Sequence, residues 1–212
     1  MSAIINNRKD IAIYDLDGTL LPFNSFKYWL AYSFILSLFF FRIDYNWLIF
    51  KLTLQRIFKK INRIVFKEKI VNFHEQNKNK AFAKRCNASF ASFLKRKTRN
   101  DLLDKHAQLV LATAAPDCYV KYYVAKMDCF ENYSASYIVN HKLNENINER
   151  KLQSVSQLIG NKIHQSVLYS DHHDDIPLAQ KVAQVFLVSP TEETMKQYEL
   201  SKIPYSVVDF RN

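Results

Sequence analysis

The sequence predicts an α/β fold in which a Rossmann-like parallel sheet carries an inserted α-helical cap. A short apolar strand, predicted over residues 10–15, comes first and carries the polar sequence DLDGT at its carboxyl end. Residues 24–105 follow without a proline or a glycine and carry apolar side chains at helical spacings. From residue 109 onwards, short apolar segments alternate with helical ones, which is typical of strands that pair in parallel.

The change of pattern along the chain sets the expected domain boundaries. We expect residues 1–22 and 106–212 to form the α/β core and residues 23–105 to form the helical cap. A core interrupted by one long insertion brings the strand before the cap next to strands that follow it.

The cap begins with a strongly apolar segment, residues 26–41. Between Lys27 and Arg42 it has 14 uncharged residues, fewer than the roughly 20 that a membrane-spanning helix needs. We therefore expect a helix that faces the protein core or lies at an interface. Apolar spacing predicts two more cap helices, one over Ile57, Ile61, Ile64, Val65 and Phe66 and one over Phe82, Cys86, Phe90 and Phe93.

The second half of the chain alternates between strands and helices. Proline favours the first turn of a helix, and glycine favours the position just after one, as at Pro116 and Gly160. The expected strands are residues 109–113, 167–171, 184–190 and 205–210, and the expected helices are residues 116–127, 149–159 and 175–183.

Polar residues follow the predicted strands where each of them ends. Asp15 and Asp17 follow the first strand, Thr113 ends the next, and Asp171 ends a later one. Lys151 lies in the first turn of the helix that precedes that later strand. Because parallel α/β sheets bind ligands at the carboxyl ends of their strands, we expect these side chains to meet at one edge.

These residues, in this order, resemble the four short motifs of the haloacid dehalogenase superfamily. The first motif is Asp15-Leu16-Asp17-Gly18-Thr19, and the second is LVLAT, ending at Thr113. The third is Lys151, and the fourth is the acidic pair Asp171 and Asp175 in SDHHDDIPLA. A helical cap between the first two motifs resembles the subfamily that contains phosphoserine phosphatase.

The resemblance implies a magnesium-dependent phosphatase and a role for each motif residue. Asp15 would attack phosphorus to form an aspartyl-phosphate, and Asp17 would move protons to the leaving alcohol and from the attacking water. Thr113, the backbone N–H of Ala114 and Lys151 would bind the phosphoryl oxygens. Mg²⁺ would be held by the carboxylates of Asp15 and Asp171 and the backbone carbonyl of Asp17, with Asp175 supporting them.

The fourth motif departs from the common pattern of the superfamily. Asp174 stands where many relatives have an asparagine, and a third carboxylate there would repel a phosphate. His172 and His173 are adjacent in the chain, and adjacent side chains rarely point at one ion. We expect both histidines to be turn residues rather than metal ligands.

The positive charge of the chain is concentrated in the cap. The net charge is +10, and between Arg42 and Lys105 there are 17 Lys and Arg residues against five acidic ones. A solvated helical surface is the simplest interpretation. Attraction to an anionic membrane is the alternative, whereas nucleic-acid binding is not expected because the chain has no recognisable motif for it. The candidate membrane anchors are Trp29, Phe34, Phe39, Phe40, Phe41 and Trp47.

Three functions stay open on these grounds. The preferred one is hydrolysis of a small phosphorylated alcohol, amino alcohol or polyol; the second is hydrolysis of a lipid phosphate at a membrane, as in a phosphatidylglycerophosphatase. The third is a non-catalytic, basic membrane or nucleic-acid module on the same scaffold. Three cysteines without a metal-type spacing, and a first decapeptide without the apolar core of a signal peptide, predict a cytoplasmic protein, with peripheral association at the inner face of the membrane as the alternative.

Overall fold

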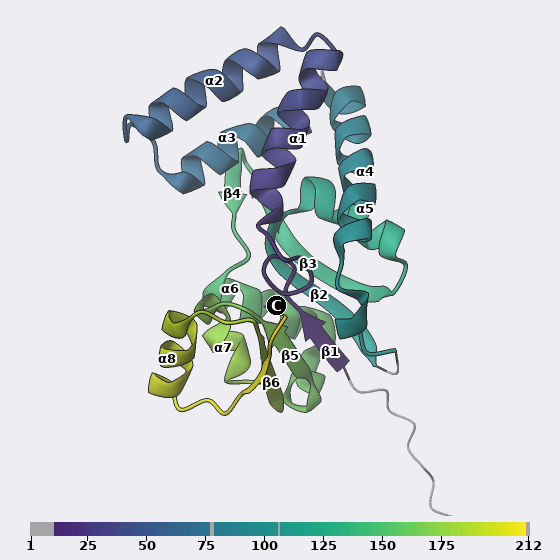
Figure 1. Ribbon diagram of the computed structural model, residues 1–212, viewed down its shortest axis with the longest axis vertical. Helices are drawn as coiled ribbons and strands as arrows, with labels where there is room; N and C mark the ends of the chain where they lie inside the picture. The colour runs from purple at the N-terminus through teal and green to yellow at the C-terminus, as the bar shows by residue number, and fades with distance from the viewer. Residues whose placement is uncertain (1–10, 77–78, 106, 211–212) are drawn as a thin grey trace, which may run out of the picture.

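The computed structural model describes residues 11–76, 79–105 and 107–210. The first ten residues, on which the expectation about a signal peptide rests, and residue 106, at an expected domain boundary, lie outside this part. Figure 1 shows two regions, a twisted sheet flanked by helices and a group of long helices at the other end of the molecule.

The sheet has seven strands in the order β4-β3-β2-β1-β5-β6-β7. Neighbouring strands run parallel except β3 and β4, which form an antiparallel pair at one edge. This architecture confirms the predicted α/β class. The strands are β1 (Ile11–Tyr14), β2 (Gln108–Pro116), β3 (Phe130–Val139), β4 (Lys142–Asn144), β5 (Val167–Ser170), β6 (Gln184–Val188) and β7 (Ser206–Val208).

Helices connect the strands and cover both faces of the sheet. One hydrophobic cluster contains Ile13 and Val110 with side chains from the later helices, and the other contains Tyr14 and Leu111 with side chains from the cap. Because all four residues of β1 are buried, this central strand is covered on both faces. The helices after β2 are α5 (Asp117–Met127), α6 (Asn148–Ile159), α7 (Ile176–Ala179) and α8 (Glu192–Leu200), and the short 3₁₀ turns are η2 (Asn100–Leu102), η3 (Gly160–Gln165) and η4 (His173–Asp175).

The four long helices of the cap lie between β1 and β2 in the chain. They are α1 (Ser25–Phe39), α2 (Ile43–Ile57), α3 (Arg63–Glu75) and α4 (Lys80–Lys97). Asn24 and Asn62 begin α1 and α3, since each side-chain oxygen accepts a hydrogen bond from a backbone N–H of the first turn. Among the helices that the structure describes, none has the length and apolar character required to cross a membrane.

Several predicted elements differ from the structure. The helix predicted across Ile57 to Phe66 is wrong, because α2 ends at Ile57 and α3 begins only after the Asn62 cap. Lys59, between them, has a φ of 54°, which a continuous helix does not allow. Pro116 ends β2 and precedes α5 instead of lying in its first turn, and the helix predicted over residues 175–183 is only the four residues of α7. The hairpin of β3 and β4 was not predicted.

Candidate active site

A cavity of about 340 Å³ opens at the carboxyl ends of the central strands, between the core and the cap. It brings together most of the residues that the sequence singled out. The lining residues are Asp15, Asp17, Gly18, Phe23, Asn24, Arg63, Ala114, Ile147, Lys151, Asp171, His172, Asp174 and Asp175.

Asp15 is fixed by the strand that it follows. Its backbone N–H donates to the carbonyl oxygen of Tyr169 on β5 at 2.9 Å, which continues the parallel pairing of β1 and β5 by one residue. The side chain is buried. The carboxylate is therefore held at the point where two neighbouring parallel strands end.

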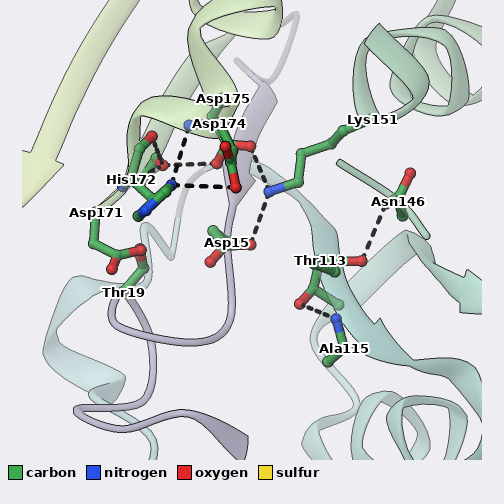
Figure 2. A network of polar contacts seen from close by, with 12 residues as sticks. Asp15, Thr19, Thr113, Ala115, Asn146, Lys151, Asp171, His172, Asp174 and Asp175 are labelled. Atoms are coloured by element: carbon green, nitrogen blue, oxygen red, sulfur yellow. Dashed lines mark hydrogen bonds and ion pairs between the residues drawn. The ribbon is translucent and has the colours of Figure 1, made fainter. Parts of the chain in front are cut away.

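Lys151 lies between two carboxylates (Figure 2). Its Nζ is 2.9 Å from Oδ1 of Asp15 and 2.6 Å from Oδ1 of Asp175. The other Asp175 oxygen, Oδ2, accepts a hydrogen bond of 2.7 Å from the Ser170 hydroxyl. The side chains of Asp15, Lys151, Ser170 and Asp175 are all buried. One ammonium group therefore neutralises two carboxylates that solvent screens only weakly.

The electrostatics of this cluster favour a further positive charge. Burial raises the pKa of Asp15, and the neighbouring Asp175 and Asp171 raise it further, against the opposing effect of Lys151. Burial and Asp175 likewise raise the pKa of Asp171. For Lys151, burial disfavours the charged form, but Asp15 and Asp175 outweigh it and raise the pKa. Carboxylates that gather in a buried cavity with too little compensating charge form a donor set suited to a hard divalent cation.

Gly18 makes room for Asp171. It has a φ of +81°, and a Cβ atom at this position would lie only 2.0 Å from Oδ2 of Asp171. The Thr19 hydroxyl, next in the chain, lies 3.4 Å from Oδ1 of the same carboxylate. The loop after β1 therefore wraps closely around the carboxylate that comes from the end of β5.

Asp17 lies beside Asp15 but faces the base of the cap. Its Oδ1 accepts a hydrogen bond of 2.8 Å from the backbone N–H of Ser25, the first residue of α1. Burial raises its pKa, while the hydrogen bonds from Ser25 act in the opposite direction. A carboxyl group with a raised pKa that borders the cavity is suited to carry a proton.

Of the second predicted motif and the residue that follows it, only Ala114 lines the cavity, and Thr113 does not. The buried Thr113 hydroxyl accepts a hydrogen bond of 3.1 Å from the backbone N–H of Ala115. Asn146 donates to the Thr113 carbonyl oxygen at 3.1 Å and so fixes the peptide unit that bears the Ala114 N–H (Figure 2).

The two histidines after β5 stack on each other, with ring centroids 4.1 Å apart. The His172 ring lies 3.3 Å from Oδ2 of Asp174, and hydrogen bonding to Asp174 raises the His172 pKa. Ligand atoms of His172, His173 and Asp174 lie within 4.8 Å of one another, although His172 is exposed. A protonated His172 would reduce the repulsion between the Asp174 carboxylate and an anion in the cavity.

The structure adds three charged residues that the sequence did not reveal. Glu145 is buried after β4, and its Oε1 accepts a hydrogen bond of 2.7 Å from Lys67 of α3. Its Oε2 accepts one of 3.0 Å from Arg63, which lines the cavity, and Lys67 also donates to the carbonyl oxygen of Ala114 at 2.7 Å. These contacts join the cap to the second motif. Arg63 and Lys67 are separated by one helical turn, but a basic helix offers many such pairs.

Arg99, where the chain leaves the cap, is bonded to the loop of the first motif. Its Nη1 donates to the carbonyl oxygens of Gly18 and Thr19 at 3.0 and 2.9 Å. Its backbone N–H donates to the carbonyl oxygen of Leu20 at 2.9 Å. Both ends of the cap therefore meet at the loop that carries Asp17 and Gly18.

Comparison with known proteins decides the family. The model of the haloacid dehalogenase-like hydrolases matches residues 12–180, most of the chain. The chain belongs to this family. The match confirms the family and the hydrolase class that the motifs predict, and no curated protein sequence matches the chain.

Solved structures of the haloacid dehalogenase-like fold are similar over nearly the whole chain. A protein of unknown function from Bordetella pertussis Tohama I has a TM-score of 0.61 and 15% identity, and the match covers 95% of this chain and 99% of that one. A phospho-aspartyl intermediate analogue of phosphoserine phosphatase has a TM-score of 0.50 and 14% identity, with 97% and 95% covered. A probable phosphoserine phosphatase from Vibrio cholerae has a TM-score of 0.54 and 10% identity, with 98% and 64% covered. At these identities the similarity establishes the fold.

Proposed function

We propose that this hydrolase is a magnesium-dependent phosphomonoesterase for a small phosphorylated alcohol, amino alcohol or polyol. The observation that carries the proposal is the placement of Lys151 between Asp15 and Asp175, beside Asp171 and Ala114, in one cavity. Phosphoryl transfer needs concentrated charge and fixed donors more than it needs covalent chemistry from the protein, and this cavity offers both.

The residues divide the reaction into two displacements. In the first, a carboxylate oxygen of Asp15 attacks phosphorus, the ester P–O bond breaks, and Asp17 gives its proton to the departing alcohol oxygen. In the second, water attacks the phosphorus of the aspartyl-phosphate and gives a proton to Asp17. The acyl–phosphate P–O bond then breaks, which releases inorganic phosphate and restores both aspartates.

Lys151 and Ala114 hold the transferring group in this scheme. Lys151, already 2.9 Å from Asp15, would neutralise phosphoryl oxygens and oppose the effect of burial on the pKa of Asp15, which helps to keep this carboxylate ionised. The Ala114 N–H would donate to a phosphoryl oxygen, in a peptide unit that Asn146 fixes from behind. Thr113 stays a predicted phosphate ligand, and its hydroxyl would have to give up the contact with Ala115.

The residues present fit Mg²⁺. The carboxylates of Asp15 and Asp171 and the backbone carbonyl of Asp17 would hold it, with Asp175 fixing Lys151 beside them. Burial raises the pKa of Asp15 and of Asp171, and neighbouring carboxylates raise both further; a bound cation would oppose both effects. When bound, the ion supplies charge neutralisation for the phosphoryl oxygens.

Hydrolysis of p-nitrophenyl phosphate with Mg²⁺ tests the proposal. We expect Asp15→Asn to abolish turnover and Asp17→Asn to lower it by about 10²–10⁴-fold, the usual contribution of general acid–base catalysis. Asp128→Asn, on the exposed end of α5 at a φ of 55° that asparagine tolerates, is the matched control and should retain activity. Full activity in Asp15→Asn would overturn the nucleophile assignment.

A panel of phosphorylated metabolites then tests the substrate class. A lipid phosphate is the second candidate, because Arg63 in the cavity lies shortly after the exposed apolar side chains Ile57 and Phe58. Faster hydrolysis of a short-chain lipid phosphate than of every soluble ester would favour it. No hydrolysis of any ester by the wild-type protein would favour a non-catalytic module.

A further inference from the structure

The first helix of the cap, α1, buries several small polar side chains and exposes several large apolar ones. Three of the four residues that it buries are serines, Ser25, Ser33 and Ser37, whereas large apolar side chains face outwards. The Ser33 hydroxyl contacts the Tyr45 hydroxyl at 2.7 Å, and the Ser37 hydroxyl donates to the Phe34 carbonyl oxygen at 2.6 Å. A helix of a globular protein normally buries its apolar stripe and exposes its polar one.

The second helix, α2, has an apolar stripe on each of two faces. One stripe, Tyr45, Ile49 and Leu52, is buried in the cap. The other follows helical spacings of three and four residues along the solvent side. It consists of Ile43, Trp47, Phe50, Leu54 and Ile57, with exposed fractions of 76, 64, 54, 38 and 66%.

The outward faces of the two helices form one surface. A groove of about 530 Å³ joins them, lined by Phe34 of α1 and by Ile43, Trp47 and Phe50 of α2. Figure 1 places α2 and the C-terminal end of α1 at the end of the molecule away from most of the sheet. We call this surface the cap-tip patch; its residues are Phe34, Ile35, Leu38, Phe39, Phe40, Phe41, Ile43, Trp47, Phe50, Leu54, Ile57 and Phe58, all of them exposed. The prediction of Trp29 as a membrane anchor is wrong, because its side chain is fully buried in the cap.

Cationic side chains border the cap-tip patch. From Arg42 to Arg63 the chain has six Lys and Arg residues and a single acidic one, Asp44. Asp44 is paired with Arg42 at 2.7 Å. Lys51, Arg56, Lys59 and Lys60 are exposed along α2 and just after it.

We propose that the cap-tip patch docks on the surface of an anionic lipid bilayer, with α2 and the C-terminal half of α1 lying in the headgroup region. Aromatic and aliphatic side chains bordered by lysine and arginine match an apolar boundary covered by negative headgroups. A second copy of this chain fits less well, because a symmetric contact would bring the two cationic borders together. Each helix has 15 residues and is about 22 Å long, so neither can cross the hydrocarbon core of about 30 Å.

Vesicle sedimentation tests the docking without any assay of hydrolysis. We expect the protein to sediment with vesicles of phosphatidylglycerol and phosphatidylcholine at low salt, and to bind vesicles of phosphatidylcholine alone much more weakly. Lys59→Glu combined with Lys60→Glu should lower the partition coefficient at least about tenfold, since each basic residue near an anionic surface contributes roughly a tenfold factor or less.

Trp47→Ser combined with Phe50→Ser tests the apolar part of the surface. We expect this variant no longer to sediment with the vesicles. Leu200→Ser is the control, because Leu200 on α8 is about as exposed as Trp47 (67% against 64%) but lies in the α/β region, and this variant should bind as the wild type does. Circular dichroism checks that each variant is folded. Lipids brominated in the acyl chain should quench the fluorescence of Trp47, because only a side chain in the membrane reaches those atoms.

Two results would overturn the proposal. One is the absence of binding to anionic vesicles at low salt by the folded wild-type protein. The other is a stable dimer, measured by sedimentation equilibrium, that Trp47→Ser dissociates, because the cap-tip patch would then be covered by a second copy.

Discussion

At the scale of single residues, Gly18 links the geometry of the backbone to the arrangement of charge. The chain has two glycines, and both have positive φ values, yet their surroundings differ. At Gly18 the missing side chain leaves room for the Asp171 carboxylate, whereas a Cβ at Gly160 would meet nothing within 4 Å. A substitution at Gly160 therefore introduces backbone strain alone, whereas one at Gly18 introduces backbone strain and a clash with Asp171.

Gly18→Ala should lower kcat by about a hundredfold or more, because the new Cβ displaces Asp171 and misplacement of about 1 Å can have that effect. Gly160→Ala is the control: its φ of +57° makes it strained, so it should lose roughly 1–3 kcal/mol of stability and keep its activity. The two measurements are kcat on an aryl phosphate and the free energy of unfolding in urea. Equal kcat values in the two variants would show that the position of Asp171 does not depend on the absence of a side chain at residue 18.

The sequence was sufficient to predict that Asp15, Lys151 and Asp171 lie together, because each follows or precedes an apolar strand and parallel strands end at one edge; all three line the cavity. It was not sufficient for Glu145, whose partners Arg63 and Lys67 come from a helix about 80 residues earlier in the chain. Pairing across such a distance depends on how the cap packs on the core. The sequence of a helix with several basic residues, such as α3, does not indicate which of its lysines is buried.

At the scale of elements, the interior of the cap is organised around a histidine. His74 of α3 is buried and packs against Trp29 and Tyr45, with ring centroids 4.5 and 5.1 Å away. Within the described part of the chain, neither ring nitrogen has a hydrogen-bond partner. Burial, helped by the positive charge of Arg42, lowers the pKa of His74 to about 3.

This histidine predicts a loss of stability in acid. In the unfolded chain it takes up a proton near pH 6.5, but in the folded chain only near pH 3, so stability falls as the pH drops between these values. At pH 4.5 the contribution is about 2–3 kcal/mol relative to pH 7.5. Urea unfolding of the wild type and of His74→Phe at the two pH values measures it. We expect the variant to lose less stability, and parallel losses in both proteins would contradict a neutral, buried His74.

The elements that the sequence did not predict have physical reasons of their own. The hairpin of β3 and β4 turns at Asn140 and His141, both with positive φ, where an Asn-Gly pair would have been the usual signal. The break between α2 and α3 has neither proline nor glycine. It depends on the Asn62 cap, and the apolar spacing on either side conceals it. The longer helices and the buried parallel strands were predictable because periodicity and apolar runs are strong signals.

At the scale of the whole molecule, the carboxylates of the cavity would connect the proposed binding of Mg²⁺ to global stability. Repulsion among Asp15, Asp171 and Asp175 opposes folding, and a bound cation should relieve it. The effect of a ligand that binds only the folded state is about 2.7 kcal/mol at a hundred times its Kd.

Thermal unfolding with and without Mg²⁺ checks this linkage. The Tm of the wild-type protein should rise by several degrees in saturating Mg²⁺, at about 2–4 °C per kcal/mol for a chain of this size. Asp171→Asn should show little rise and, in EDTA, should melt no lower than the wild type, because the substitution removes a repelling charge. A large Mg²⁺-dependent rise in Asp171→Asn would place the cation elsewhere.

The hydrogen bonds of Arg99 connect the cap directly to the loop after β1. The guanidinium holds the carbonyl oxygens of Gly18 and Thr19, and the Arg99 backbone N–H holds that of Leu20, so both roots of the cap are tied to one short loop. A cap that swings about these roots must either break these hydrogen bonds or pull the loop along with it. Opening the cavity to exchange product for substrate would then also shift the peptide units between Asp17 and Leu20. Movement of the cap would in this way change the geometry of the site that it covers.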